Sequence, residues 1–265
     1  MSQTFSTVQV EWSDAVCRVR FDKPGQLNAL DNEMADELAV LFGEVLPNSE
    51  ARVVVISGNG GTFMAGASLD RLESWRAQPP EAVAKALTTG FTAVMVELTP
   101  MPVVAAVDGV AFGIGLDICL AADTVIATDR AVFALPETDV GVVPLGGSTH
   151  ILAHRVGLGR ATRIVMFGEK VPAQRALEWG LVSSVVTPEE LDGAVDALVD
   201  KLLRRSPGAM RAAKRLLRST PALTVEEAAR AERAEFLACL TAPDVAEGIA
   251  AVRERRRPQF ARGAV

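Results

Sequence analysis

The sequence predicts an α/β fold with a mostly parallel sheet, followed by a helical C-terminal region. Buried apolar runs alternate with helical patterns over roughly the first 145 residues, and glycine-containing turns separate them, which is typical of α/β proteins. Helical patterns dominate after that point. Hydrophobic residues form 49% of the 265 residues and charged residues 23%, which is enough apolar material for one large domain or for a core domain with a helical appendage.

The first elements follow from local patterns. Val8–Trp12 and Val16–Phe21 alternate apolar and polar residues around a short polar turn, which predicts a hairpin. Asp31 is placed to cap a helix, because apolar residues follow it at helical spacing. Arg52–Ser57 is continuous and β-branched, which indicates a strand buried on both faces.

The remaining elements are defined by apolar runs and prolines. Residues 81–98 have an amphipathic helical pattern that ends before Pro100. Further strands are expected at Val103–Val107, Thr124–Ala127, Val132–Ala134 and Val182–Val186. Helix starts are expected at Pro188, Pro207, Pro221 and Pro243, and Arg253–Arg257 is expected to close the last helix with cations.

Composition excludes several classes of protein. The net charge of −6 argues against nucleic acid as a main partner. We expect a soluble, cytoplasmic protein without a membrane partner, because the sequence shows no signal-peptide pattern and no apolar run long enough to cross a bilayer. The three cysteines are far apart and predict free thiols. His150 and His154 lack further ligand residues nearby, so we expect no metal site.

The most informative stretch is 104–117 (VAAVDGVAFGIGLD), which is followed by Glu137 at a second strand end. An apolar run stops at glycines, a helix begins, and Asp117 lies in its first turns. Backbone N–H groups at a helix start, beside two acids, suit the stabilisation and protonation of an enolate. Glycines at 66, 113 and 115 permit unusual dihedrals and close approach to a ligand, although such glycines also suit strand–helix packing.

Six segments together resemble one family, the crotonase (enoyl-CoA hydratase/isomerase) superfamily. Residues 22–30 (DKPGQLNAL) resemble its RP…NAL segment, and 61–69 (GTFMAGASL) resemble AFxAGADL. Residues 104–117 resemble VxGxAxGGGxEL, and 133–144 (FALPETDVGVVP) resemble FxxPExxxGxxPGxGG. Residues 176–182 (ALEWGLV) and 256–260 (RRPQF) resemble later motifs. The segments occur in order over nearly the whole chain, so their combination is specific.

The resemblance implies a crotonase-like spiral of ββα turns over residues 1–200 and a C-terminal helical trimerisation region over 201–265, with homotrimers that often pair into hexamers. It implies an acyl-CoA thioester substrate, and no cofactor beyond the CoA carried by that substrate. The backbone amides of Ala67 and Ile114 correspond to the oxyanion hole, and Asp117 and Glu137 to the two catalytic carboxylates. Substrate contacts are expected from Gln26, Leu27, Ala29, Ala65, Gly66, Leu69 and Gly113.

Two further parts of the substrate site are expected from the sequence. Residues 71–98 are expected to line the acyl pocket, with Trp75, Leu87, Phe91 and Met95 as the large side chains. Lys23 and the cluster at Arg253–Arg257 are candidates for contacts to the CoA phosphates.

The chain departs from the hydratase pattern at Asp117, Ser68 and Met64, of which Met64 is tolerable, so three functions stay open. Asp117 replaces the usual glutamate and is shorter by one carbon, about 1.5 Å of reach. Aspartate here resembles some dienoyl-CoA isomerases, but the further acid of those enzymes corresponds to Leu145, and Ser68 replaces the usual acid after the first oxyanion alanine. The hypotheses are hydration of a 2-enoyl-CoA, isomerisation of an enoyl-CoA with Glu137 as a single proton shuttle, and non-catalytic binding of an acyl-CoA.

Overall fold

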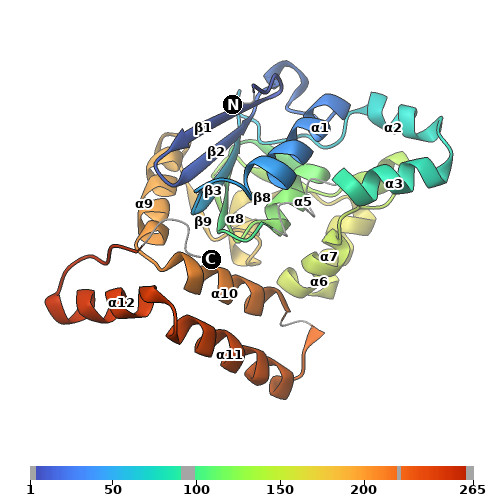
Figure 1. The fold of residues 1–265 in the computed structure, drawn as a ribbon. Coiled ribbons are helices and arrows are strands. Elements are labelled where there is room, and N and C mark those ends of the chain that lie inside the picture. The colour runs from blue at the N-terminus through green and yellow to red at the C-terminus, as the bar shows by residue number, and fades with distance from the viewer. Residues whose placement is uncertain (1–3, 91–98, 220–221, 261–265) are drawn as a thin grey trace.

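The computed structural model describes residues 4–90, 99–219 and 222–260 (Figure 1). A six-stranded sheet runs through the core in the order β1-β2-β3-β4-β6-β9. Its strands are β1 (Val8–Ser13), β2 (Val16–Phe21), β3 (Val53–Gly58), β4 (Val103–Val107), β6 (Thr124–Thr128) and β9 (Ser184–Val186). Only the β1–β2 hairpin is antiparallel, with its turn at Asp14 and Ala15; the other pairs are parallel, as the sequence predicts.

A second sheet, in the order β5-β7-β8, continues two strands of the first. Its strands are β5 (Val110–Phe112), β7 (Val132–Ala134) and β8 (Val171–Pro172). Strand β4 turns into β5 at Asp108 and Gly109, and β6 turns into β7 in the same way. Thr128 and Arg130 both donate hydrogen bonds to the Asp108 carboxylate, which ties the two corners together. Successive strand–corner–strand units followed by a helix make up the spiral of a crotonase-like fold.

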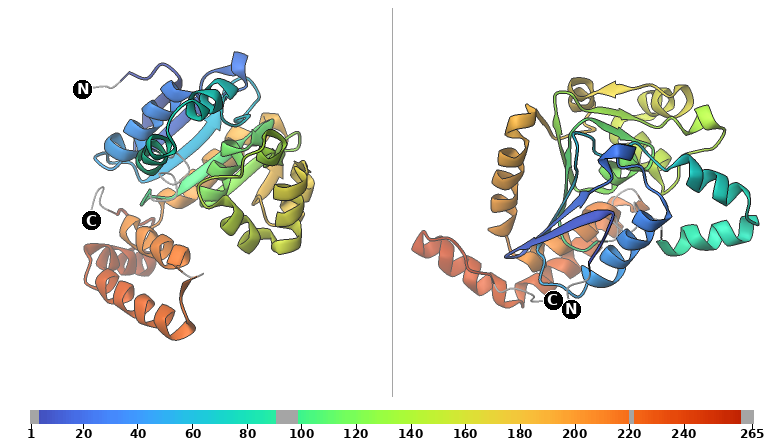
Figure 2. Two further views of the ribbon diagram at one scale, coloured as in Figure 1. Left: turned by 90° about the vertical axis from the view of Figure 1, so that its right-hand side faces the viewer. Right: turned by 90° about the horizontal axis from the view of Figure 1, so that it is seen from above.

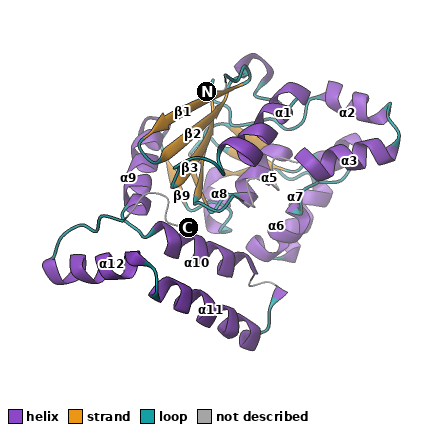
Figure 3. Cartoon of the chain, viewed as in Figure 1, coloured by secondary structure: helices purple, strands orange, loops and turns teal. Residues whose placement is uncertain are grey.

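Helices surround the two sheets, as Figure 3 shows by the purple segments around the orange strands. In the core they are α1 (Asn32–Val40), α2 (Leu69–Arg76), α3 (Pro80–Gly90), α5 (Ile114–Ala121), α6 (Ser148–Val156), α7 (Leu158–Phe167), α8 (Ala173–Glu178) and α9 (Leu191–Leu203). Short helical turns are η1 (Pro24–Gln26), η2 (Leu41–Val45), η3 (Glu137–Val140) and η4 (Pro188–Glu190). Asp31 caps α1 by accepting the Met34 N–H at 2.9 Å, as its position predicts.

The main sheet is buried on both faces. Helix α9 covers one face through Leu191, Val195 and Val199, which pack with valines of β3 and β4. The other face carries the larger apolar cluster, to which α1 and α5 contribute, and Figure 2 shows α1 and α9 on opposite sides of the strands. This double burial explains why the strands are continuous apolar runs rather than alternating ones.

Three C-terminal helices lie together beside the core: α10 (Pro207–Ser219), α11 (Val225–Leu240) and α12 (Pro243–Glu254) (Figure 1). Helix α10 is attached to the core by buried Lys214, which donates to Met101 O and pairs with Asp123 at 2.7 Å. Large apolar side chains on α11 and α12 are exposed, including Phe236 at 63% and Val252 at 79%. The division into a 1–200 core and a 201–265 trimerisation region stays a prediction.

Some expected elements differ from the structure. The helix expected over 81–98 is α3 over Pro80–Gly90, and residues 91–98, like Pro221, lie outside the described residues. The expectation that Arg253–Arg257 closes the last helix is only partly right, because α12 ends at Glu254. Arg255 takes a left-handed conformation with φ 54°, and Arg256 then turns back to pair with Glu247 and Glu254.

Candidate active site

Three segments, distant in sequence, run side by side: the loop through Leu30, residues 64–67 and strand β5. Residues 64–67 lie in the middle. On one side Met64 N–H donates to Val110 O at 3.0 Å, and Phe112 N–H donates to Met64 O at 2.9 Å. On the other side Leu30 N–H donates to Gly66 O at 2.8 Å, and Ser68 N–H donates to Leu30 O at 3.0 Å. This pairing fixes the backbone around position 67 next to the start of α5.

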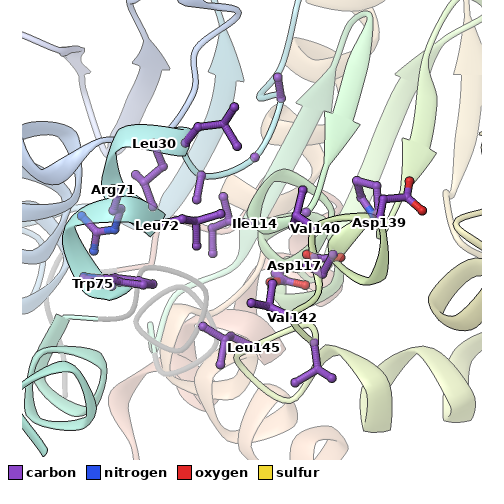
Figure 4. Close-up of a pocket in the computed structure, with 18 residues that line it drawn as sticks. Leu30, Arg71, Leu72, Trp75, Ile114, Asp117, Asp139, Val140, Val142 and Leu145 are labelled. Atoms are coloured by element: carbon purple, nitrogen blue, oxygen red, sulfur yellow. The ribbon is translucent and has the colours of Figure 1, made fainter. Parts of the chain in front are cut away.

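A cavity of about 350 Å³ opens beside these segments (Figure 4). Of the residues that the sequence assigns to the site, the cavity brings together Ala67, Ile114, Asp117, Glu137, Ala65, Gly66, Leu69 and Gly113. Gln26, Leu27 and Ala29 are not in its lining. They belong to the 22–30 loop, where Leu27 O accepts a hydrogen bond from Ala65 N–H at 3.0 Å.

Two backbone N–H groups at the cavity have no acceptor within the described part of the chain. Because the groups flanking Ala67 bind Leu30, the Ala67 N–H points to the opposite side of its segment. Ile114 is the first residue of α5, and the first intrahelical bond, from Asp117 N–H to Gly113 O, begins beyond it. Both residues line the cavity, and the helix start adds a positive partial charge there.

Glycines bring these two segments into contact. Gly66 has φ +109° and Gly113 has φ +52°, conformations that residues with a side chain rarely adopt. A Cβ on Gly113 would lie 3.5 Å from Gly66 Cα and 3.1 Å from Glu137 Oε1. Gly115 differs from the expectation for it, because it has ordinary helical geometry; a Cβ there would lie 2.5 Å from Met64 O. Its role is therefore close packing of α5 rather than an unusual dihedral.

Asp117 is an acid in an almost dry environment. It is 3% exposed within α5, and its Oδ1 is buried with no hydrogen-bond partner among the described residues. Burial, and to a lesser degree the nearby Glu137 carboxylate, raise the pKa of Asp117 well above its usual value. Hydrogen bonding from the Ser148 hydroxyl lowers the pKa and offsets this only in part.

Glu137 faces the cavity from the turn η3, directly after β7 and Pro136. Its Oε2 is buried and has no partner in the described chain. Burial raises the pKa of Glu137 as well. The site thus joins two orphaned carboxyl oxygens with two orphaned backbone donors, a combination that can move protons beside a stabilised oxyanion.

The rest of the cavity wall is largely apolar. Trp75 and Leu72 of α2 line it, as the sequence range 71–98 predicts for the acyl pocket, but Leu87 does not, and Phe91 and Met95 lie outside the described residues. The opposite wall is a segment that sequence reasoning missed, formed by Val140, Val142, Val143 and Leu145. Most of this segment belongs to the matched motif at 133–144, but the motif does not indicate a binding wall, because only the fold places the segment across the cavity from α2.

Asn28 is a further residue whose role the sequence does not reveal. It is fully buried with φ 54°; its amide donates to Asn59 O and Thr62 O, and its side-chain oxygen accepts the Lys23 N–H at 2.9 Å. These bonds join the 22–30 loop to the segment that leads to Ala67. Lys23 itself pairs with Asp31.

The described residues also bear on metal, thiol and membrane chemistry. No group of three or more His, Cys, Asp or Glu residues is placed to hold a metal ion in the described ranges, and His150 and His154 contact each other edge to face on α6. All three cysteines are free, and burial raises the pKa of Cys17 to about 12. None of the described helices is long and apolar enough to span a membrane.

Comparison with known proteins decides the family. The family model described as enoyl-CoA hydratase/isomerase matches residues 11–263. The chain belongs to the enoyl-CoA hydratase/isomerase family. This places it in the crotonase superfamily, and its crotonase-like fold is shared with solved structures. The chain is accordingly an enzyme of an acyl-CoA-processing family.

Several hydratase/isomerase relatives cover almost the whole chain. It is 33% identical to the carnitinyl-CoA dehydratase of Proteus mirabilis (strain HI4320), over 93% of this chain and 95% of that protein. It is 32% identical to the 2,3-dehydroadipyl-CoA hydratase of Escherichia coli (strain K12), over 96% and 98%. The crystal structure of an enoyl-CoA hydratase from Bacillus anthracis superposes with a TM-score of 0.89 at 29% identity, over 98% of this chain and all of that one.

Proposed function

We propose that this enzyme hydrates a 2-enoyl-CoA thioester to a 3-hydroxyacyl-CoA through a stabilised enolate. One observation carries the proposal: Asp117 and Glu137, each with a buried oxygen that has no partner among the described residues, line the same cavity as the backbones of Ala67 and Ile114. An unpaired buried acid is costly for stability, so two of them in one cavity favour a functional role over a structural one.

In the proposed reaction the thioester oxygen accepts hydrogen bonds from the Ala67 and Ile114 N–H groups. Water adds to C3 and gives up a proton to an ionised carboxylate, while the electrons of the C2–C3 double bond move onto the thioester oxygen. A protonated carboxyl group then delivers its proton to C2, which restores the thioester. The deeper burial of Asp117 favours it as the protonated partner. One oxyanion donor typically contributes about 3 kcal/mol to such a step.

Isomerisation is the second candidate, and the identity and burial of Asp117 favour it. The shorter side chain and almost complete burial of Asp117 work against simultaneous contact of the site with water and with C2. In that case Glu137 alone would remove a proton from one carbon and return it to another, moving it between C2 and C4 of the enolate. A third possibility is a binder that keeps the two donors without productive acid geometry.

An absorbance assay separates the three candidates. A hydratase removes the conjugated-thioester band of a 2-enoyl-CoA, an isomerase creates that band from a 3-enoyl-CoA, and a binder changes neither while still binding the ester in calorimetry. We expect loss of the band. Absence of any change with 2-enoyl-CoA, in protein that binds the ester, would contradict the proposed hydration.

Asp117→Asn separates hydration from isomerisation in the same assay. A two-acid hydratase should lose at least about 100-fold in turnover, because one proton transfer is removed. A single-acid isomerase should change only mildly.

Two further properties belong to the proposal. No cofactor is needed, since CoA is part of the substrate and the residues at hand supply proton transfer; dialysis against a chelator should leave turnover unchanged. Self-association as a homotrimer or hexamer is supported by the exposed apolar side chains of α11 and α12, which a partner subunit would cover. Nucleic acid is not among the proposed partners, given the net charge of −6.

A further inference from the structure

Arg71 is a cation in the otherwise largely apolar wall formed by α2. Its side chain is half-buried, and it lines the cavity together with Leu72 and Trp75. The guanidinium carbon lies over the Trp75 ring, 4.6 Å from its centroid, in a cation–π contact. Figure 4 shows this pair across the cavity from Asp117.

The hydrogen bonds of Arg71 leave part of its donor set unused. Its Nη1 donates to Asp31 O at 3.1 Å and to Asn32 Oδ1 at 2.8 Å, both uncharged acceptors. Its Nε is buried without a partner in the described chain. A guanidinium carries five donors in a fixed fork, and that fork matches a carboxylate in two-point contact.

Burial lowers the pKa of Arg71, and the carboxylates of Asp36 and Asp31 offset this only in part, because neither is paired with the guanidinium. Among the described residues it forms no ion pair, and the Asp31 carboxylate is occupied by Lys23 and by the Met34 N–H. Asp139 also lines the cavity, but its carboxylate points away from it (Figure 4). A half-buried cation without a paired carboxylate is unfavourable, and a ligand anion in contact with it would offset that cost.

We propose that Arg71 determines substrate specificity by binding a carboxylate at the end of the acyl chain remote from the thioester. This inference rests on the proposed function, because it assumes that the acyl chain of a CoA thioester occupies the cavity. The charges then complement each other along the cavity, with acids Asp117 and Glu137 near the thioester and a cation at the α2 wall. The acyl group would be that of a dicarboxylic acid esterified once to CoA.

The experiment measures binding first, so that it does not depend on turnover. Affinities for two saturated esters, adipyl-CoA and hexanoyl-CoA, are compared by calorimetry in the wild type and in Arg71→Gln, Arg71→Lys and Arg76→Gln. Arg76 is the matched control, because it is an exposed arginine of the same helix outside the cavity lining. We expect Arg71→Gln to weaken adipyl-CoA binding about 10- to 100-fold. Hexanoyl-CoA binding should stay within about twofold, and Arg71→Lys should recover part of the loss.

The alternatives give different results, and each overturns the inference. If Arg71 binds a CoA phosphate instead, Arg71→Gln weakens both CoA esters equally and leaves the matching N-acetylcysteamine thioesters unaffected. If Arg71 only ties α2 to the start of α1, the variant lowers Tm and affinity for every ester alike. Failure of the proposed function would show differently, as absence of turnover of 2-hexenoyl-CoA and 2-hexenedioyl-CoA in wild-type protein that still discriminates between the saturated esters.

Discussion

Glu137 and Asp117 lie at one cavity but in different surroundings. Glu137 is partly accessible at the start of a short helical turn, and Asp117 is enclosed within α5. A general acid or base must reach both its proton and the substrate, so the accessible residue is the one that every catalytic candidate requires.

Replacement of Glu137 is therefore the most severe single change that we predict. Glu137→Gln keeps the size of the side chain and removes its ionisation, so turnover should fall at least about 100-fold while affinity for an acyl-CoA changes little. Steady-state rates and calorimetry check this. Glu178→Gln, at an exposed acid of α8, is the control and should behave as the wild type. Retained turnover in Glu137→Gln would refute the assignment.

The buried Asp117 carboxyl group should make stability depend on pH in a defined direction. Burial raises its pKa above the ordinary value of 3.8, so between these two values the folded chain holds a proton that the unfolded chain has lost. Stability then falls as pH rises through that window. Asp117→Asn does not titrate, so it should be more stable than the wild type near neutral pH, on the order of 1 kcal/mol.

The test of this pH dependence is denaturant unfolding of both proteins at several pH values. The advantage of Asp117→Asn should shrink as the pH falls toward 3.8, where the wild-type carboxyl is neutral in both states. An advantage that is the same at all pH values, or a variant less stable than the wild type, would show that Asp117 is not the unpaired buried acid described here.

At the scale of elements, the turn from β5 into α5 determines the geometry of the site. Gly113 combines φ +52° with direct contact to Gly66 and Glu137. Gly113→Ala should cost about 1–3 kcal/mol of stability through backbone strain, and it should lower turnover further by displacing Glu137. Gly193→Ala in α9, where a Cβ meets nothing within 4 Å, is the control and should be neutral or slightly stabilising. Equal effects of the two substitutions would contradict this account of the turn.

Elements that form through contacts between sequence neighbours were predictable from the sequence. Elements that form only through contacts between distant segments were not. The cap at Asp31 and the β1–β2 hairpin depend on neighbours in sequence, and the structure confirms both. The short strands β5 and β8 form only because the spiral brings them beside β7, so no local pattern marks them. The role of Gly115 was likewise not predictable, because the sequence alone does not distinguish a glycine that packs against Met64 from a glycine that contacts a ligand.

At the scale of the whole molecule, the apolar surface of α11 and α12 predicts assembly. Phe236 and Leu240 are more than half exposed. Charged substitution of both, Phe236→Asp with Leu240→Asp, should shift the protein from a trimer or hexamer toward monomer in light scattering after size-exclusion chromatography. Trp12→Asp changes an exposed aromatic of β1 in the core sheet and should leave assembly intact. A monomeric wild type would contradict the proposed self-association.

The candidate site is built from segments that are distant in sequence, so only the residues within recognisable motifs could be predicted. The residues that match motifs, among them Ala67, Ile114, Asp117 and Glu137, were identifiable and do line one cavity. The wall around Val142 was not, because the match of residues 133–144 to a motif does not say which side chains line a cavity, and this segment faces α2 only in three dimensions. The role proposed for Arg71 could not be predicted either, because it depends on the contact with Trp75 and on the cavity, which only the structure shows.

The central claim is that negative charge gathers on a thioester oxygen held by two backbone amides. A crystal structure with a saturated acyl-CoA bound tests it most directly, because the oxygen is then visible beside its donors. The account predicts the thioester oxygen about 2.7–3.1 Å from both Ala67 N and Ile114 N, with Asp117 facing C2 and Glu137 facing C3. A thioester bound with its oxygen away from either amide would contradict it.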